Sequence, residues 1–84
     1  MTVSLLRLEA GCSLEFAPSD IERVKAALEQ LYGVPLVGKS SPILTVYTFA
    51  SANLIFQNEW EDPCLIANEP EGVAMLEQVA KALG

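Results

Sequence analysis

Residues 43–49 read Ile-Leu-Thr-Val-Tyr-Thr-Phe, which is the strongest strand signal in the chain. Six of these seven residues are β-branched or aromatic, a composition that favours a β-strand. A turn over residues 50–53 separates it from a second predicted strand at 54–58. Residues 59–63 predict a loop, or an edge strand that Pro63 ends, and residues 64–67 predict a last short strand.

The N-terminal part predicts another hairpin and the first of two helices. Residues 3–9 and 12–16 carry apolar side chains at alternating positions on either side of a turn at residues 10–11. Ser19, with Glu22 three residues later, predicts a helix N-cap, and Gly33 predicts the end of that helix. Residues 34–42, which hold two prolines and a glycine, predict an irregular connector. Near the C-terminus, an Asn68 cap and Pro70 in the first turn predict the second helix.

The predicted element order is therefore ββ-α-βββ-α. Each amphipathic helix needs one face covered, and a single sheet covers both helices if they lie on the same side of it. We expect an α+β fold: one domain over residues 1–84, built as a two-layer sandwich, with a mostly antiparallel sheet of about five strands and two helices on one face. Leu5, Leu44, Val46 or Leu54 must then point to the other face, which is a physical reason to expect a partner or a homodimer there.

Composition excludes several classes of protein. The 84 residues are 51% hydrophobic and 19% charged, which is incompatible with intrinsic disorder. The net charge is −6 with only five basic residues, so we expect neither nucleic-acid binding nor attraction to anionic membranes. Residues 1–4 carry no basic segment or cleavage site, which predicts a cytoplasmic protein with two reduced cysteines. Histidine is absent, and with it the commonest general base and metal ligand.

One literal motif is present. Residues 33–40, Gly-Val-Pro-Leu-Val-Gly-Lys-Ser, resemble the phosphate loop of P-loop NTPases at these eight positions. That loop needs a strand before it and a helix after it, whereas here a predicted helix precedes it and a β-branched run follows. We therefore expect Gly33, Gly38, Lys39 and Ser40 to bind no nucleotide. The sequence predicts no cofactor, no metal and no catalytic residue, and hence no enzyme.

Trp60 is the one tryptophan, and it lies among Glu59, Glu61 and Asp62 in a C-terminal third that is strongly acidic. A calcium site is not expected because the segment lacks the turn glycine, and a solvated acidic loop is the plainest reading of these acids. Trp60 either lies over the edge of the core or is an exposed anchor for a partner, with Glu59, Glu61 and Asp62 as its rim.

The function that best fits these features is a small acidic protein-interaction module. It would bind a basic protein, as an antidote, immunity protein or regulator does, or it would bind a second copy of itself as a homodimer. The alternative is a small-molecule-binding α+β module without catalytic activity, which would need polar groups converging in a pocket between the sheet and the helices.

Overall fold

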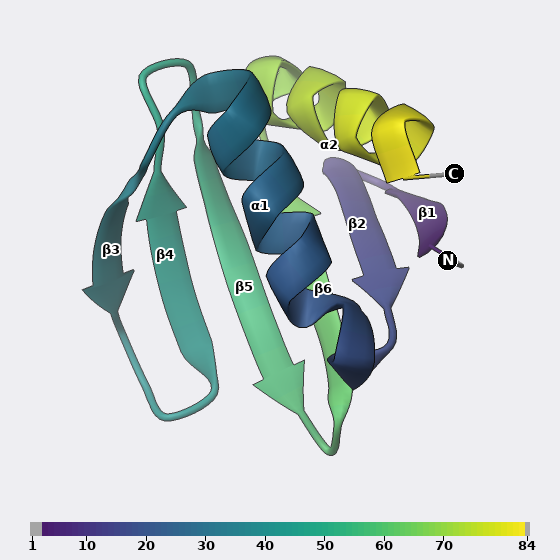
Figure 1. Cartoon of the computed structure of the whole chain (residues 1–84), viewed down its shortest axis with the longest axis vertical. Helices are drawn as coiled ribbons and strands as arrows, with labels where there is room; N and C mark the ends of the chain where they lie inside the picture. The colour runs from purple at the N-terminus through teal and green to yellow at the C-terminus, as the bar shows by residue number, and fades with distance from the viewer. Residues whose placement is uncertain (1–2, 84) are drawn as a thin grey trace.

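The computed structural model describes residues 3–83 and contains one six-stranded antiparallel sheet and two α-helices (Figure 1). In chain order the elements are β1 (Val3–Leu8), β2 (Gly11–Phe16), the 3₁₀ turn η1 (Pro18–Asp20), α1 (Ile21–Tyr32), β3 (Leu36–Lys39), β4 (Leu44–Thr48), β5 (Asn53–Glu59), β6 (Asp62–Ala67) and α2 (Pro70–Leu83). The strands are arranged in the order β1-β2-β6-β5-β4-β3. Thus β3 to β6 form a meander, and the N-terminal hairpin joins it through the pairing of β2 with β6.

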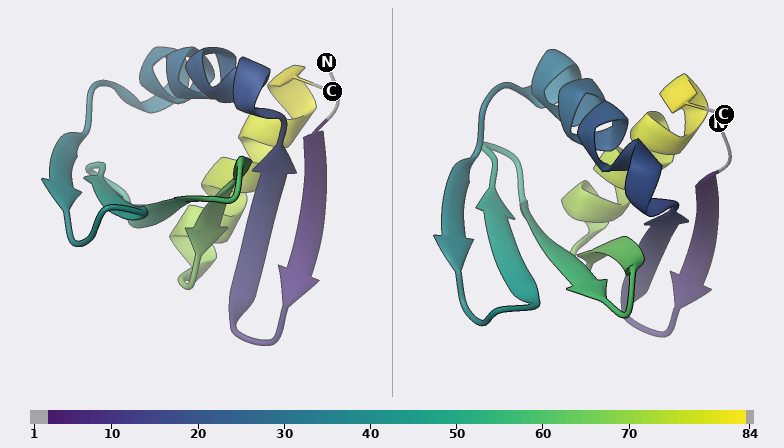
Figure 2. Two further views of the ribbon diagram at one scale, coloured as in Figure 1. Left: turned by 90° about the horizontal axis from the view of Figure 1, so that it is seen from below. Right: turned by 60° about the horizontal axis from the view of Figure 1, so that its bottom comes forward.

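The predicted α+β two-layer sandwich is confirmed, and both helices lie on one side of a strongly twisted sheet (Figure 2). The sheet has six strands rather than about five, because the predicted connector at residues 34–42 contains β3. Residues 36–39 pair with Thr45–Thr48 and so satisfy the backbone groups along that side of β4. The loop between the two strands is closed by Ser41, whose Oγ accepts hydrogen bonds from the N–H groups of Ile43 and Leu44.

Two further local predictions are wrong. Ser19 is not the N-cap of the first helix, since residues 18–20 form a 3₁₀ turn and α1 begins at Ile21 without a side-chain cap. Residues 59–63 are not a separate loop or edge strand. Glu59 ends β5, Asp62 begins β6, and only Trp60 and Glu61 connect them.

The core lies between the sheet and the helices, and it follows the alternation of side chains along each strand. From the sheet, the fully buried aliphatic residues are Leu14, Leu54 and Leu65; from the helices, they are Val24, Leu76 and Val79. Complete burial of each such side chain contributes about 2 kcal/mol to stability. These residues come from β2, β5, β6 and both helices, so the two layers are held by one continuous cluster.

The other face of the sheet has no helix over it. The register places Leu6, Ser13, Ile66, Ile55 and Val46 side by side across five strands on this outer face. The three β-branched members, Ile66, Ile55 and Val46, are each half-buried, and Leu6 is exposed. The predicted outward position is therefore correct for Leu44 and Val46, whereas Leu5 and Leu54 face the helices.

Two glycines in strands differ sharply in how much the fold depends on them. A Cβ at Gly11 would lie 1.8 Å from the carbonyl oxygen of Ala67, whereas a Cβ at Gly38 would meet nothing within 4 Å. Gly11→Ala should therefore lower the free energy of unfolding by about 3 kcal/mol, because the backbone of β6 must shift. Gly38→Ala should change it by less than about 0.5 kcal/mol. Urea unfolding of both variants measures the difference, and equal stabilities would contradict the close approach of β2 to the end of β6.

Candidate functional site

The β5–β6 hairpin ends in a two-residue turn formed by Trp60 and Glu61. Glu59 pairs with Asp62, and the two residues between them have φ values of 55° and 56°. Positive φ at both central positions defines the turn type that suits a two-residue hairpin, and Asn-Gly is its usual sequence. A left-handed conformation costs a non-glycine residue roughly 1–2 kcal/mol. The chain therefore carries a tryptophan and a glutamate at positions where local energetics favour smaller residues.

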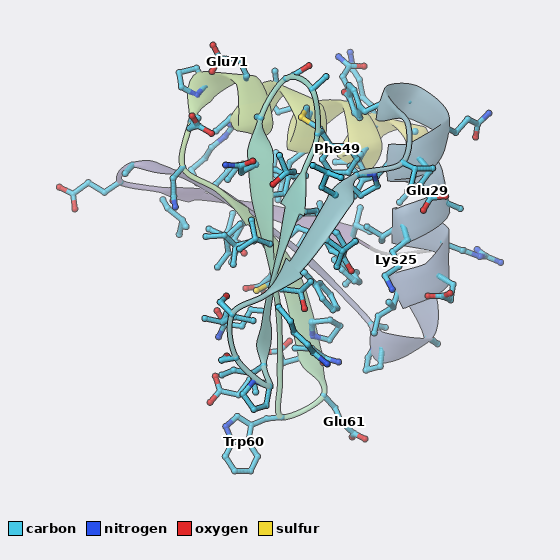
Figure 3. All side chains as sticks on the ribbon, turned by 90° about the vertical axis from the view of Figure 1, so that its left-hand side faces the viewer. Lys25, Glu29, Phe49, Trp60, Glu61 and Glu71 are labelled. Atoms are coloured by element: carbon cyan, nitrogen blue, oxygen red, sulfur yellow. The ribbon has the colours of Figure 1, made fainter. Side chains whose placement is uncertain are left out.

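The indole ring of Trp60 lies in solvent, with 91% of the residue exposed. Its Nε1 donates a hydrogen bond to Oε1 of Glu59 at 3.2 Å, and Nε2 of Gln57 donates to the other carboxylate oxygen, also at 3.2 Å. The ring leans toward the side of the sheet opposite α1, while Glu61 lies on the α1 side (Figure 3). Trp60 thus does not lie over the edge of the core, and Glu59 fixes its orientation on the outer side.

The charges at this tip are not neutralised by neighbouring cations. Within residues 3–83 the ion pairs join Arg7 to Glu77 and Lys25 to Glu22, and neither is near the hairpin. Glu61 and Asp62 are exposed, and Glu59 is half-buried with its carboxylate used by Trp60 and Gln57. We call residues 59–62 the hairpin tip. It combines one large exposed aromatic ring with three carboxylates.

The outer face of the sheet continues from the hairpin tip. A hollow of about 300 Å³ lies on this face, lined by Val46, Ile55 and Ile66 and by the more polar Asn53, Asn68 and Glu69. By register, the charged strand residues on this face are all acidic, namely Glu15, Glu59 and Asp62. Sequence reasoning missed this arrangement. The sequence does show apolar residues on both faces of the central strands. That Val46, Ile55 and Ile66 lie side by side, however, follows only from the position of β6 between β2 and β5.

The segment that resembles a phosphate loop does not form one. Gly33 ends α1 with φ 85°, and its N–H donates to the carbonyl of Glu29, as predicted for a helix end. Gly38 and Lys39 lie in the extended strand β3, and the chain then turns at Ser40 and Ser41 into β4. Since a strand rather than a helix follows, these residues offer no cluster of converging N–H groups for a phosphate.

The two cysteines are free and cannot pair within the chain. Cys12 lies opposite Ala67, and Cys64 lies opposite Glu15, so alternation directs the two side chains to opposite faces of the sheet. Burial raises the pKa of the Cys12 thiol. Burial also raises the pKa of Cys64, and a hydrogen bond with Ser13 partly offsets that rise. Both groups are therefore protonated near neutral pH and poorly nucleophilic.

Small-molecule sites between the sheet and the helices are poorly developed. Beneath α1, the cavity lined by Leu28, Tyr47 and Phe49 measures about 20 Å³, which is room for one water. A larger groove of about 480 Å³ lies between β1 and α2, where the ion pair of Arg7 with Glu77 forms part of the wall. Glu77 raises the pKa of Arg7 through this contact.

The described residues hold neither a cluster of metal-binding side chains nor a membrane-spanning helix. Residues 3–83 contain no group of three or more cysteine, aspartate or glutamate residues arranged to hold a metal ion. Over the same residues, neither α1 nor α2 has the length and apolar composition needed to cross a lipid bilayer.

The comparisons with known proteins add no functional assignment. No protein-family model, curated protein or solved structure matches this chain. Any assignment of function therefore depends on the geometry described above.

Replacing Glu61 by glycine should stabilise the protein. Glycine adopts φ near 56° without the clash that a Cβ creates, so Glu61→Gly should raise the free energy of unfolding by roughly 0.5–1 kcal/mol. Glu61→Ala is the matched control, since it removes the same carboxylate but keeps the Cβ, and it should give no such gain. Thermal and urea unfolding measure both variants. A glycine variant that is less stable than the alanine variant would contradict the turn geometry.

The Gly-Lys-Ser segment should not respond to nucleotide. Titration with ATP and Mg²⁺ at millimolar concentration should leave the melting temperature unchanged, because a ligand that binds the native state raises it. Lys39→Ala is the control for specificity. A rise of several degrees that Lys39→Ala abolishes would show that residues 33–40 bind phosphate after all.

Proposed function

We propose that this chain is a small cytoplasmic protein-interaction module, without catalytic activity of its own, that binds a basic protein segment through the hairpin tip. The observation that carries the proposal is the 91% exposure of Trp60 at the end of a two-residue turn. An exposed tryptophan contributes little to folding, and tryptophan is the residue most enriched among those that dominate binding energy at protein interfaces.

The geometry of the tip reduces the entropic cost of binding. The hydrogen bond from Trp60 to Glu59 restricts the ring, and Gln57 restricts the Glu59 carboxylate in turn. A side chain that is already held in one orientation loses less freedom when a partner covers it. Complete burial of the ring in a pocket of the partner would remove about 200 Å² from water.

The charge of the tip supports a partner rich in lysine and arginine. The three carboxylates of the hairpin tip lie within two residues of Trp60 in the chain, and none of them is in an ion pair among the described residues. With a net charge of −6, the chain would attract a basic partner over several ångströms and accelerate the encounter. The partner would present an apolar pocket for Trp60 with basic residues around it. An antidote, an immunity protein or a regulator of a basic protein would use such a surface.

The experiment is a selection from a random library of 16-residue peptides on the wild-type protein, with counter-selection on Trp60→Ala. We expect enrichment of lysine- and arginine-bearing peptides that depend on Trp60. For an enriched peptide, Trp60→Ala should weaken binding by about 30-fold or more, as loss of a dominant aromatic contact does. Triple neutralisation, Glu59→Gln with Glu61→Gln and Asp62→Asn, should mainly slow association, by about tenfold at low salt.

Leu8→Ala is the matched control. Leu8 is also a large exposed apolar residue, but it lies in β1, away from the hairpin tip, so its removal should leave the peptide affinity unchanged. Unfolding of Trp60→Ala should differ from wild type by less than about 1 kcal/mol, which separates loss of binding from loss of fold. The proposal fails if the enriched peptides bind Trp60→Ala as tightly as wild type, or if they carry no excess of basic residues.

A further inference from the structure

The edge strand β3 is the most exposed apolar strand of the sheet. Val34, Leu36 and Val37 are 82%, 76% and 65% exposed, which makes them the three most exposed large aliphatic residues among those described. Val34 precedes β3, and the other two lie in it, at the edge where the sheet ends. Exposed edges present unpaired backbone groups, and proteins usually protect them with charges, bulges or covering loops. Here the edge has one lysine and a preceding proline, but three exposed aliphatic residues.

The direction of the free backbone groups follows from the ladder between β3 and β4. The N–H of Ser40 donates to the carbonyl of Leu44 at 3.1 Å, and this pair continues the register in which Lys39 lies opposite Thr45. In an antiparallel pair, alternate residues direct their N–H and C=O groups at the neighbouring strand. Gly38 therefore bonds to β4, as Ser40 does, whereas Val37 and Lys39 direct theirs to the open edge. The carbonyl of Pro35 has the same direction.

Gly38 is not explained by the packing of a single chain. A Cβ built on it would meet nothing within 4 Å, and its φ is not in the left-handed range. Glycine weakens a strand, and in strands it often marks a place where another chain approaches closely. Gly38 and Leu36 lie on the same face of β3, two residues apart. The space that a side chain at position 38 would fill is therefore free, and it lies beside the exposed Leu36 on the edge of the sheet.

The distribution of charge limits where a second copy can bind. Between Glu29 and Glu59 the sequence contains no aspartate or glutamate, and Lys39 is the only charged residue in that interval. The interval includes β3 and β4. All eleven acidic residues lie elsewhere, where two chains of net charge −6 repel each other. The β3 edge is therefore the part of the sheet that two copies can approach with least repulsion.

We propose that two copies of this chain pair through β3 as an antiparallel, two-fold symmetric dimer centred on Val37. In this register each Val37 N–H donates to the Val37 carbonyl of the other copy, and each Lys39 N–H donates to the Pro35 carbonyl of the other copy. Pro35 lacks an N–H, so only the Lys39 carbonyl stays with water. Leu36 of one copy lies opposite Gly38 of the other, where the missing side chain leaves room for it.

The dimer would join the two six-stranded sheets into one continuous sheet. It does not depend on the hairpin tip, which belongs to β5 and β6. The contact covers only a few residues of each strand, so it belongs to the small interfaces and its population should depend on concentration. A pairing of β3 with β1 of the next copy would instead be open-ended and give a series of larger species.

Sedimentation velocity over roughly 5 to 500 µM tests the proposal, because mass action populates a weak dimer as concentration rises. The wild type should move from monomer to dimer and no further. Gly38→Val should weaken dimerisation by at least about tenfold, since the new side chain fills the space for Leu36. Leu36→Ala should weaken it in the same direction by removing the inserted side chain. Ser4→Val, at an exposed position on the same face of the other edge strand, should dimerise like wild type.

Amide hydrogen exchange identifies the surface directly. The N–H groups of Val37 and Lys39 should exchange freely in the monomer and become protected in the dimer, while that of Gly38 should be protected in both. Circular dichroism confirms that each variant is folded. The proposal is overturned by a wild type that stays monomeric at 500 µM, by species larger than a dimer, by dimerisation that both β3 variants leave intact, or by unprotected Val37 and Lys39 amides in the dimer.

Discussion

The pairing of β2 with β6 is the contact on which the rest of the structure depends. It joins two segments that are some fifty residues apart in the chain, and it places Leu14 beside Leu65 in the middle of the sheet, where both are buried. α2 packs over this region, with Leu76 and Val79 buried against it. Without this pairing, the N-terminal hairpin and the meander from β3 to β6 would each have a second open edge, at β2 and at β6, and α2 would lack a complete surface to cover. The close approach of Gly11 to Ala67 lies at the end of the same seam.

The hairpin tip and the β3 edge, which are both exposed to solvent, differ in charge and in polarity. The hairpin tip is acidic and carries one exposed aromatic ring, and the outer face beside it has acidic residues but no basic ones in its strands. The β3 edge is apolar and lies in an interval without acids. From its net charge of −6 alone, the chain would be expected to repel other acidic proteins and other copies of itself. The fold separates the acidic hairpin tip, which we propose binds a basic partner, from the β3 edge, which we propose binds a second copy.

Much of this fold could be predicted because its strongest signals are local. The β-branched run at 43–49, the alternation at 12–16 and the apolar stripes of both helices each specify one element without knowledge of the others. β3 is not predicted because Pro35, Gly38 and Pro42 are residue types that strands disfavour. The strand forms because it pairs with β4. Ser19 and Glu22 match the sequence pattern of a helix N-cap, but residues 18–20 form a 3₁₀ turn, so α1 begins only at Ile21. The charge and the single tryptophan of residues 59–62 predict an interface there, and that function stays a prediction. The two-residue turn of the hairpin tip could not be foreseen, because neither Trp60 nor Glu61 favours positive φ.

The strand order also has a consequence for how the chain folds. β3, β4, β5 and β6 pair with their neighbours in sequence, so each of these contacts closes only a short loop. The seam between β2 and β6 instead requires the first sixteen residues to find a segment that begins at residue 62. Contacts that are distant in sequence form slowly, because the entropy of closing the loop is lost before the contact is made. The meander would therefore assemble early with α1 loosely attached, and docking of the N-terminal hairpin, together with α2, would limit the folding rate. Until that step, one edge of the apolar strand β6 is open to water.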